Sequence, residues 1–364
     1  MLKILLIAGT RPEIIKLAPI FIAAKNRKYK NKIKIEFCYT GQHKKMAEDA
    51  LSIFDIKPDI NLSIMKVGQT IDHVASEIFK KLPKIFKKVN PDVVLVQGDT
   101  TTAAMSAICT FQNKILVGHI EAGLRSFDIN SPFPEEFNRL AISRIAKYNF
   151  CPTKNSNQNL ISEGVNKKSL FITGNTVVDA LRIISKNNKL NNLNRINKKI
   201  NKPFILITAH RRESFGKGFK NICNAIRDSA IKYPKLQFVY PVHLNPNVQQ
   251  PVKNILGKLK NVILLEPVNY LELLTLLKNS LFVLTDSGGI QEEAPSFNKY
   301  CIVMRYVTER VESIKLGNSK LVGTNKDKIC KAIEKQINNP SNKKFISPFG
   351  DGFAAEKILE ILSR

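Results

Sequence analysis

Short apolar runs alternate with longer amphipathic stretches along most of the chain. The runs are rich in Val, Ile and Leu and end in small or polar residues, and they lie at 3–7, 34–39, 93–96, 115–120, 204–208, 236–240, 262–265, 282–284 and 301–304. Stretches with helical character, such as 71–88 and 101–112, fall between them. Strands that alternate with helices predict an α/β fold, in which parallel sheets carry helices on both faces.

A pause in this pattern predicts two domains, which is also the natural division for 364 residues. Residues 186–202 are rich in Asn and Lys, which is typical of an exposed linker or a loose helix. The break at 348–352 precedes a last helix that could cross back onto the first domain. We therefore expect two Rossmann-like domains facing each other across a cleft, one spanning 1–176 plus 350–364 and the other 177–349.

Composition narrows the class of protein. The formal net charge is +27, but the lysines are dispersed among Asn and Ile, and no Arg-rich stripe with interleaved aromatics is present, so we do not expect nucleic-acid binding. The longest apolar runs are far shorter than a membrane span, and the apolar N-terminus is expected to be a core strand, not a signal peptide. We expect a cytoplasmic protein without a membrane partner.

Cysteine and histidine spacing gives no sign of a metal centre. The six cysteines are scattered without a CxxC pair, and the five histidines never take a spacing such as HExxH. We therefore predict reduced core cysteines and no metal site.

The stretch 281–295 predicts an anion-binding turn. An apolar strand runs into Thr285-Asp286-Ser287 and two glycines, Gly288 and Gly289, and a helix is expected from 290. Such a turn can point backbone N–H groups and the helix dipole at a phosphate. Glu292 and Glu293 would then fall in the first helical turn, where a carboxylate is favoured and can reach a sugar hydroxyl. An ordinary strand-to-helix turn fits the same pattern.

Cationic side chains follow the first strand of each predicted domain. Arg11 and Lys16 lie at the start of the first helix, where both could face an anion. In the second domain His210 could bind a leaving phosphate through a hydrogen bond, and the neighbouring arginines, with Arg310 further along, could neutralise it. A helix-capping cluster is the alternative.

Three carboxylates, Asp99, Glu121 and Glu135, are placed at or just beyond strand ends of the first domain. Such a group can divide the work of general base, general acid and stabiliser of a developing positive charge. Together with a diphosphate held in the second domain, it suits cleavage of the bond between a sugar C1 and a phosphate oxygen.

The motifs closely resemble those of the bacterial non-hydrolysing UDP-N-acetylglucosamine 2-epimerases. The resemblance covers nearly the whole chain and rests on GTRPEIIKLAP, TGQHKKM, QGDTTT, GHIEAGLRS, SPFPEEFNR, TGNTVVDAL, AHRRESFGKGF, YPVHLNPNV and LTDSGGIQEEAPS. It implies a GT-B-type fold, a homodimer, and interconversion of UDP-N-acetylglucosamine and UDP-N-acetylmannosamine without an added cofactor. The implied route is elimination of UDP to a 2-acetamidoglucal, followed by re-addition.

The resemblance also implies roles for individual residues. The family's catalytic positions match Asp99, Glu121, Glu135 and His210. Its substrate-binding positions include three of these residues, Asp99, Glu121 and His210. They also match Arg11, Lys16, Val268, Leu273, Ser287, Gly288, Gly289, Glu293 and Arg310, with Val268 and Leu273 at the uracil end.

Activation by a second UDP-N-acetylglucosamine molecule is a further implication, for which Gln42, His43, Arg211 and Glu213 are the candidate residues. The chain departs from some members at Lys45 and Gly68, and Val311 stands where the family usually has Pro after the arginine. We expect these departures to affect the strength of regulation and the turn around Arg310, not the chemistry.

Other functions remain open from the sequence. A hydrolysing 2-epimerase could use the same residues, and the substrate could be a related 2-acetamido UDP-sugar, because nothing fixes the substituents at C3 and C6. A GT-B glycosyltransferase would need an acceptor, and a non-enzymatic polyanion-binding protein would bind in a salt-dependent way without the carboxylates.

Overall fold

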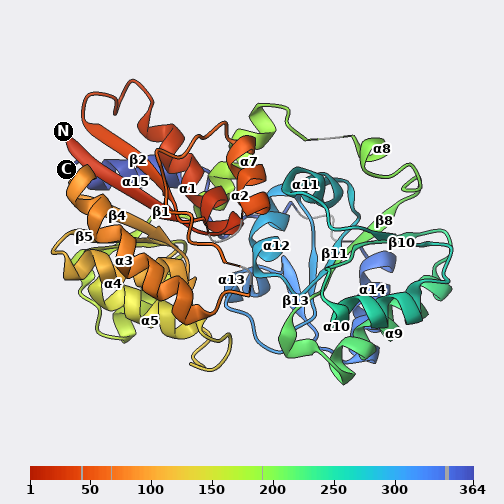
Figure 1. Ribbon diagram of the computed structural model, residues 1–364. Coiled ribbons are helices and arrows are strands. Elements are labelled where there is room, and N and C mark those ends of the chain that lie inside the picture. The colour runs from red at the N-terminus through yellow and green to blue at the C-terminus, as the bar shows by residue number, and fades with distance from the viewer. Residues whose placement is uncertain (42–43, 67, 191, 341–343) are drawn as a thin grey trace. The chain divides into compact units, whose positions relative to one another are not determined.

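The computed structural model describes residues 1–41, 44–66, 68–190, 192–340 and 344–364. The chain forms two compact units, one of Met1–Asn187 with Phe349–Arg364 and the other of Asn188–Pro348. Each unit is built on a parallel sheet with helices packed against it, so the predicted α/β class is confirmed (Figure 1).

The sheet of the first unit has the strand order β3-β2-β1-β4-β5-β6-β7 among the described residues, and every neighbouring pair is parallel. Its strands are β1 Leu2–Ala8, β2 Ile33–Tyr39, β3 Ile60–Asn61, β4 Val93–Gln97, β5 Leu116–Ile120, β6 Tyr148–Cys151 and β7 Leu170–Ile172. The central strands β1, β4 and β5 lie side by side, so the segments that leave their carboxyl ends start from one edge of the sheet.

Helices cover both faces of this sheet. They are α1 Arg11–Ala24, α2 Lys44–Ile53, α3 Ile71–Val89, α4 Thr101–Gln112, α5 Glu135–Ile145, α6 Lys154–Ser162, η1 Lys167–Ser169, α7 Thr176–Lys186 and α15 Ala354–Leu362. α1 packs with α7 and α15, while α3, α4 and α5 pack together over β1 and β4. Thr70 and Thr100 start α3 and α4 by accepting hydrogen bonds from His73 N and Ala103 N, which explains why both helices begin where the sequence predicts.

The second unit has the strand order β10-β9-β8-β11-β12-β13, also parallel throughout. Its strands are β8 Phe204–Thr208, β9 Gln237–Pro241, β10 Val262–Leu265, β11 Val283–Thr285, β12 Cys301–Val303 and β13 Ser319–Leu321. The helical segments are α8 Leu193–Ile196, η2 Arg212–Ser214, α9 Lys217–Lys232, α10 Pro246–Leu256, α11 Tyr270–Asn279, α12 Gly288–Glu293, η3 Ala294–Phe297, α13 Val311–Lys315 and α14 Lys326–Asn338. α9 lies between α10 and α14 over a core of buried aliphatic and aromatic side chains.

The C-terminal helix crosses back onto the first unit, as predicted. The Asp179 carboxylate on α7 accepts hydrogen bonds from Ala354 N (3.2 Å) and Ala355 N (2.8 Å), the first two N–H groups of α15. Arg182 Nε donates to Gly352 O at 2.7 Å, and its Nη2 reaches Glu356 Oε1 at 3.0 Å. Because α7 packs on α1 and α15, the first unit extends to Asn187 and does not end at the predicted residue 176.

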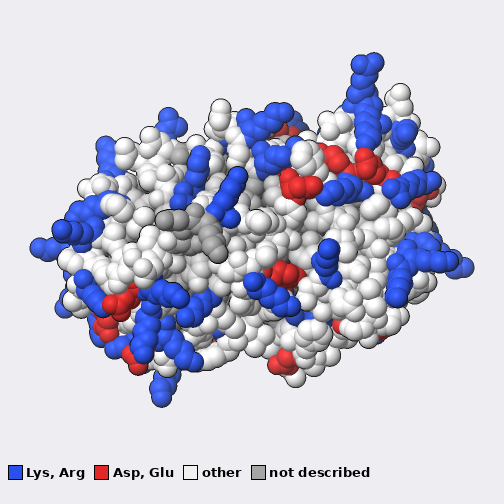
Figure 2. Space-filling model, turned by 180° about the vertical axis from the view of Figure 1, so that it is seen from behind, with Lys and Arg blue, Asp and Glu red and all other residues white. Residues whose placement is uncertain are grey.

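The surface and the cysteines are consistent with the composition. On the face drawn in Figure 2, Lys and Arg side chains lie in separate groups with uncharged surface between them. No helix in the described ranges is both long and apolar enough to cross a membrane. The six cysteines form no disulfide, and all are buried except the half-buried Cys330.

Asp179→Ala should loosen the C-terminal helix. The substitution removes both acceptors from the N-terminus of α15, so we expect a loss of about 1–2 kcal/mol in the free energy of unfolding. Urea denaturation measures this loss, and hydrogen exchange should become faster in α15. Asp72→Ala, at an exposed position in the first turn of α3, is the matched control. Equal effects of the two substitutions would contradict the capping role.

The same carboxyl group predicts a pH dependence. Burial raises the pKa of Asp179 from 3.8 to about 6, so the folded state binds the proton more tightly than the unfolded state. The part of the stability that comes from this tighter proton binding is complete below about pH 4 and is lost as the pH rises through about 6. The free energy of unfolding of the wild type minus that of Asp179→Asn should therefore fall by up to about 3 kcal/mol between these pH values. A flat or rising difference would contradict the assignment.

Candidate active site

The carboxyl ends of β1, β4 and β5 carry the predicted residues of the first unit. Arg11 and Lys16 follow β1, Asp99 follows β4, and Glu121 follows β5. These strands are neighbours in the sheet. Open parallel sheets bind ligands at the carboxyl ends of their strands.

Glu121 lies in a buried ion pair. It is the first residue after β5, with a positive φ of 68°. Its Oε2 is 2.5 Å from Lys16 Nζ on α1, and Gln97 Nε2, at the end of β4, donates a hydrogen bond to the same oxygen. Lys16 therefore contacts a carboxylate, where the sequence suggested that it would face an anion of a ligand. The pair ties together α1, β4 and β5.

Asp99 is held by a second cation. Its Oδ2 accepts hydrogen bonds from Arg139 Nε at 2.9 Å and Nη2 at 2.6 Å, and its backbone oxygen accepts one from Asn138 Nδ2 at 2.8 Å. The Asp99 side chain is 28% exposed, whereas that of Arg139 is 5% exposed. A buried arginine thus fixes a carboxylate that solvent can still reach.

Glu135 is the half-buried first residue of α5, one helical turn before Arg139. Glu136, the next residue, is buried and pairs with Arg139 Nη1 at 2.8 Å. Its other oxygen accepts hydrogen bonds from the backbone N–H groups of Ser126 and Phe127. Glu135 therefore lies on the same helix, α5, as Arg139, which holds Asp99.

Sequence reasoning missed Arg139 and Gln97. The spacing of four residues from Glu135 to Arg139 on a predicted helix is the signal that could have drawn attention to the arginine. No local signal indicates Gln97, because its partner Glu121 comes from the neighbouring strand.

Two further buried groups hold the turns in place. Glu13 accepts hydrogen bonds from Gly9 N, Thr10 N and Thr100 Oγ1, and burial raises the pKa of this carboxyl. His119 lies 2.7 Å from Gly98 O through Nε2, and burial lowers its pKa to about 4. His119 is therefore neutral near pH 7. Because a carbonyl can only accept, Nε2 carries the proton.

In the second unit, Asp286 organises the segments that follow β8 and β11. Its fully buried carboxylate accepts hydrogen bonds through Oδ2 from His210 N at 2.7 Å and Arg211 N at 2.8 Å. Arg211 Nε in turn donates to Asp286 O at 3.1 Å. These contacts fix the backbone of the His210 segment beside the glycine turn.

The His210 side chain remains accessible, with 43% of its surface exposed. Its ring stacks on that of His243, with centroids 5.3 Å apart and an angle of 11° between the planes. Nδ1 lies 3.7 Å from Asp286 Oδ1. Burial, and then the neighbouring His210, lower the pKa of His243. The two imidazoles therefore form an exposed pair at the carboxyl ends of β8 and β9.

The glycine turn differs from its predicted form. Ser287 is the N-cap, so α12 begins at Gly288 and not at 290. Glu292 and Glu293 consequently lie in the last turn of this short helix, and the expectation that they fall in the first turn, favoured by the dipole, is wrong. Glycine residues are poor helix formers, and this is why the start was placed too late.

Arg310 lies directly beneath the turn. It is buried, and its Nε and Nη2 donate to Glu292 Oε1 at 2.8 and 2.6 Å, while Nη1 donates to Glu309 Oε2 at 3.0 Å. A Cβ atom at Gly288 would be only 2.7 Å from Arg310 Cζ, so only glycine allows this approach. Arg310 is also the N-cap of α13, in which Val311 is the first residue.

The ion pairs around Arg310 continue from Glu309 to Arg305, away from the glycine turn. Arg305 pairs with Glu309 at 3.1 Å and with Glu213 at 2.7 Å. Burial and the nearby Arg305 lower the pKa of Arg211. Arg211 and Glu213, two of the proposed regulatory residues, thus adjoin the network that holds Arg310.

The remaining predicted residues lie around α11 or outside the described ranges. Glu293 Oε1 accepts a hydrogen bond from Tyr270 Oη at 2.9 Å, and Val268 and Leu273 are half-buried on either side of that tyrosine. Gln42 and His43 lie outside the described residues, and Gly68 takes a φ of 69°. No group of three or more potential metal ligands occurs in the described part of the chain.

Comparisons with known proteins agree along nearly the whole chain. A family profile described as UDP-N-acetylglucosamine 2-epimerase matches residues 25–363. The chain is similar to a UDP-N-acetylglucosamine 2-epimerase of Campylobacter jejuni, with 46% identity over 99% of this chain and 97% of that protein.

Solved structures show the same similarity. The structure of the Neisseria meningitidis UDP-GlcNAc 2-epimerase bound to UDP-GlcNAc has a TM-score of 0.94 and 41% identity, with 99% of each chain covered. That of the Methanocaldococcus jannaschii UDP-GlcNAc 2-epimerase in complex with UDP-GlcNAc and UDP has a TM-score of 0.86 and 37% identity, and it covers 100% of this chain and 99% of that one. The chain therefore belongs to the UDP-N-acetylglucosamine 2-epimerase family.

Proposed function

We propose that this isomerase interconverts UDP-N-acetylglucosamine and UDP-N-acetylmannosamine reversibly, without hydrolysis, and so supplies an activated mannosamine sugar for surface polysaccharide. The observation that carries this proposal is the pair of carboxylates at adjacent strand ends, Asp99 and Glu121, each with its own buried cationic partner. The UDP-GlcNAc and UDP ligands named for the related structures support a UDP-sugar substrate.

Inversion at C2 needs a proton to leave one face of the sugar and a proton to arrive on the other. In the proposed route, a base removes the C2 proton and the C1–O bond breaks, so UDP departs with the bonding electrons and a 2-acetamidoglucal forms. Protonation of C2 on the opposite face and re-addition of UDP at C1 complete the reaction. Two separately held carboxylates can serve as base and acid, and Glu135 can stabilise the developing positive charge.

We assign the second unit to the UDP part of the substrate. His210 is proposed to bind the departing diphosphate, together with the Ser287, Gly288 and Gly289 turn. Arg11 is a further proposed nucleotide-binding residue. Arg310 would act from beneath that turn, since Glu292 and Glu309 already hold its guanidinium. Glu293 is proposed to contact the ribose, with Val268 and Leu273 near the uracil.

Regulation and assembly are also proposals. A second UDP-N-acetylglucosamine molecule would act near Arg211 and Glu213, with Gln42 and His43, and the protein would form a homodimer. Light scattering in solution would test the homodimer, and a sigmoidal dependence of rate on UDP-N-acetylglucosamine would test the activator.

The central experiment is an NMR time course of the pure protein with UDP-N-acetylglucosamine in D2O, without metal or acceptor. We expect UDP-N-acetylmannosamine to grow to a stable mixture, with deuterium entering at C2. Steady accumulation of free UDP and N-acetylmannosamine would show the hydrolysing reaction instead. No reaction would overturn the proposed substrate and direct attention to related 2-acetamido UDP-sugars or to an acceptor-dependent transferase.

Glu121→Gln should lower turnover by about 10³-fold, the scale of a lost proton-transferring group, while UDP binding stays within about twofold. Turnover is measured by the NMR assay and UDP binding by calorimetry. Glu77→Gln, which alters a surface ion pair with Lys81, is the control and should leave both unchanged.

Because Glu121→Gln leaves Lys16 buried without its charged partner, Asp99→Asn provides a second test at a partly exposed carboxylate. Circular dichroism would verify the fold of each variant. Normal turnover in both variants would show that these carboxylates are not catalytic.

Arg11→Ala should weaken UDP binding about tenfold or more, as expected for a charge-assisted hydrogen bond to phosphate. Calorimetric titration with UDP measures the change. Arg27→Ala, an exposed arginine in the turn after α1, is the matched control. Unchanged affinity in Arg11→Ala would mean that Arg11 acts only in the local structure.

A further inference from the structure

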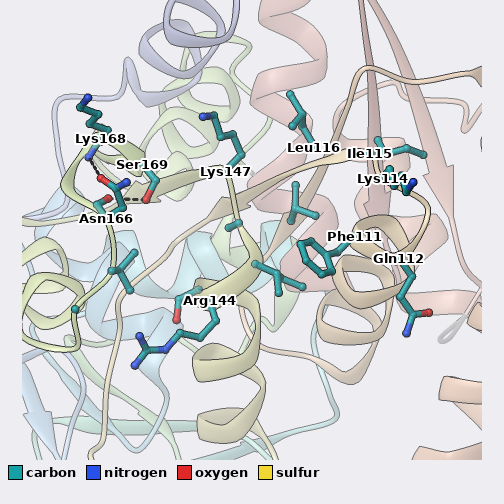
Figure 3. A pocket seen from close by; sticks show the side chains of 16 residues that line it. Phe111, Gln112, Lys114, Ile115, Leu116, Arg144, Lys147, Asn166, Lys168 and Ser169 are labelled. Carbon is teal, nitrogen blue, oxygen red and sulfur yellow. Dashed lines mark hydrogen bonds between the residues drawn. The ribbon is translucent and has the colours of Figure 1, made fainter.

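A cavity of about 800 Å³ lies in the first unit, and none of the assigned site residues that the structure describes is in its lining. It is lined by side chains from 111–117, 143–147 and 164–169, that is, by the end of α4, the start of β5, the end of α5 and the segment between α6 and β7 (Figure 3). We call it the α4–α6 cavity.

The cavity lies at the amino-terminal ends of the strands, whereas the candidate active site lies at their carboxyl ends. Leu116, the first residue of β5, lines the cavity, whereas Glu121 follows the other end of this strand. In the same way α4 begins beside Asp99 and ends at the cavity with Phe111 and Gln112. A ligand here would therefore not occupy the positions of Asp99 and Glu121.

The cavity has apolar walls that are partly open to water. They are formed by seven side chains, Phe111, Ile115, Leu116, Val117, Ile145, Ala146 and Val165. Phe111 is 55% exposed and Leu116 is 42% exposed, and Figure 3 shows Phe111 in the middle of the lining. Covering such surface is favourable, so an apolar ligand group would be stabilised here.

Four cations, Lys114, Arg144, Lys147 and Lys168, line the same cavity, and the lining contains no Asp or Glu. All four are exposed, and none forms an ion pair with any residue in the described ranges. Gln112 and Asn166 add amide groups. The electrostatic field of this cluster is positive, which favours an anionic ligand group close to the apolar walls.

We infer that the α4–α6 cavity binds a small organic anion with an apolar body, such as an aliphatic carboxylate. The volume lies in the range of small-molecule sites, and these combine apolar walls with a few polar groups. Neither the apolar walls nor the cations alone would select this class, because the first would accept a neutral hydrocarbon chain and the second any small anion.

Calorimetric titration of the full-length protein with decanoate, below its micelle concentration, tests the proposal. We expect saturable binding of decanoate, at least tenfold weaker binding of the neutral decanol, and weaker decanoate binding as the salt concentration rises. Acetate, which has the charge without the chain, should not bind measurably. Decanol binding as tight as decanoate binding, or no decanoate binding, would overturn the inference.

Two variants locate the ligand in this cavity. Lys147→Glu should weaken decanoate binding about tenfold and leave decanol binding unchanged, whereas Phe111→Ala should weaken both. Lys30→Glu makes the same change of charge at an exposed residue outside the lining and should have no effect. An equal loss in Lys30→Glu and Lys147→Glu would show that only the overall charge attracts decanoate.

The test does not depend on the epimerase proposal. Decanoate affinity should be the same with and without excess UDP, because none of the proposed nucleotide-binding residues lines the cavity and Glu121 and Asp99 lie at the opposite ends of β5 and α4. Competition between UDP and decanoate would place decanoate elsewhere and overturn the assignment, whatever reaction the protein catalyses.

Discussion

Buried charge at the ends of parallel strands is the constraint on which both units depend. An isolated carboxylate away from water is strongly destabilising, so it needs cations or N–H donors close by. Glu121 meets this need with Lys16 and Gln97, and Asp286 meets it with the backbone N–H groups of His210 and Arg211. In each unit one buried carboxylate therefore joins the segments that leave neighbouring strands, and the proposed functional side chains are carried by those segments.

A chain of alternating charges extends this principle in the second unit. Glu213, Arg305, Glu309, Arg310 and Glu292 contact one another in that order, and all but Glu213 are buried. Each arginine lies between two carboxylates, which offsets the cost of removing it from water. The network leaves Arg310 little freedom to move. Its charge is thus already in place beneath the Gly288 backbone, and a diphosphate there would need no rearrangement of this side chain.

The sequence was most informative where local signals are strong. Long apolar runs identified β1, β4, β8 and β9, and the helical stretches 71–88 and 101–112 placed α3 and α4 closely. The short strands β3, β6, β7 and β13 were not predicted, because two to four residues give too little periodicity and the polar Asn149 interrupts the apolar pattern of β6 (Tyr148–Cys151). The positions of Asp99, Glu121 and His210 at strand ends were predicted correctly. Their partners were not, because Arg139 and Gln97 meet them only through sheet order and helix packing.

The local chemistry also limits which groups can move protons. His119 is the histidine closest along the chain to Glu121, but it is fully buried, its pKa is lowered to about 4, and its Nε2–H is committed to Gly98 O. It can fix the turn before Asp99 but cannot exchange a proton with a ligand at neutral pH. Asp99 is different, because Arg139 contacts its Oδ2 while more than a quarter of the side chain stays exposed. A carboxylate that is held on one oxygen and open to solvent is suited to proton transfer, whereas Glu121, enclosed by Lys16 and Gln97, would exchange a proton only with a substrate that is already bound.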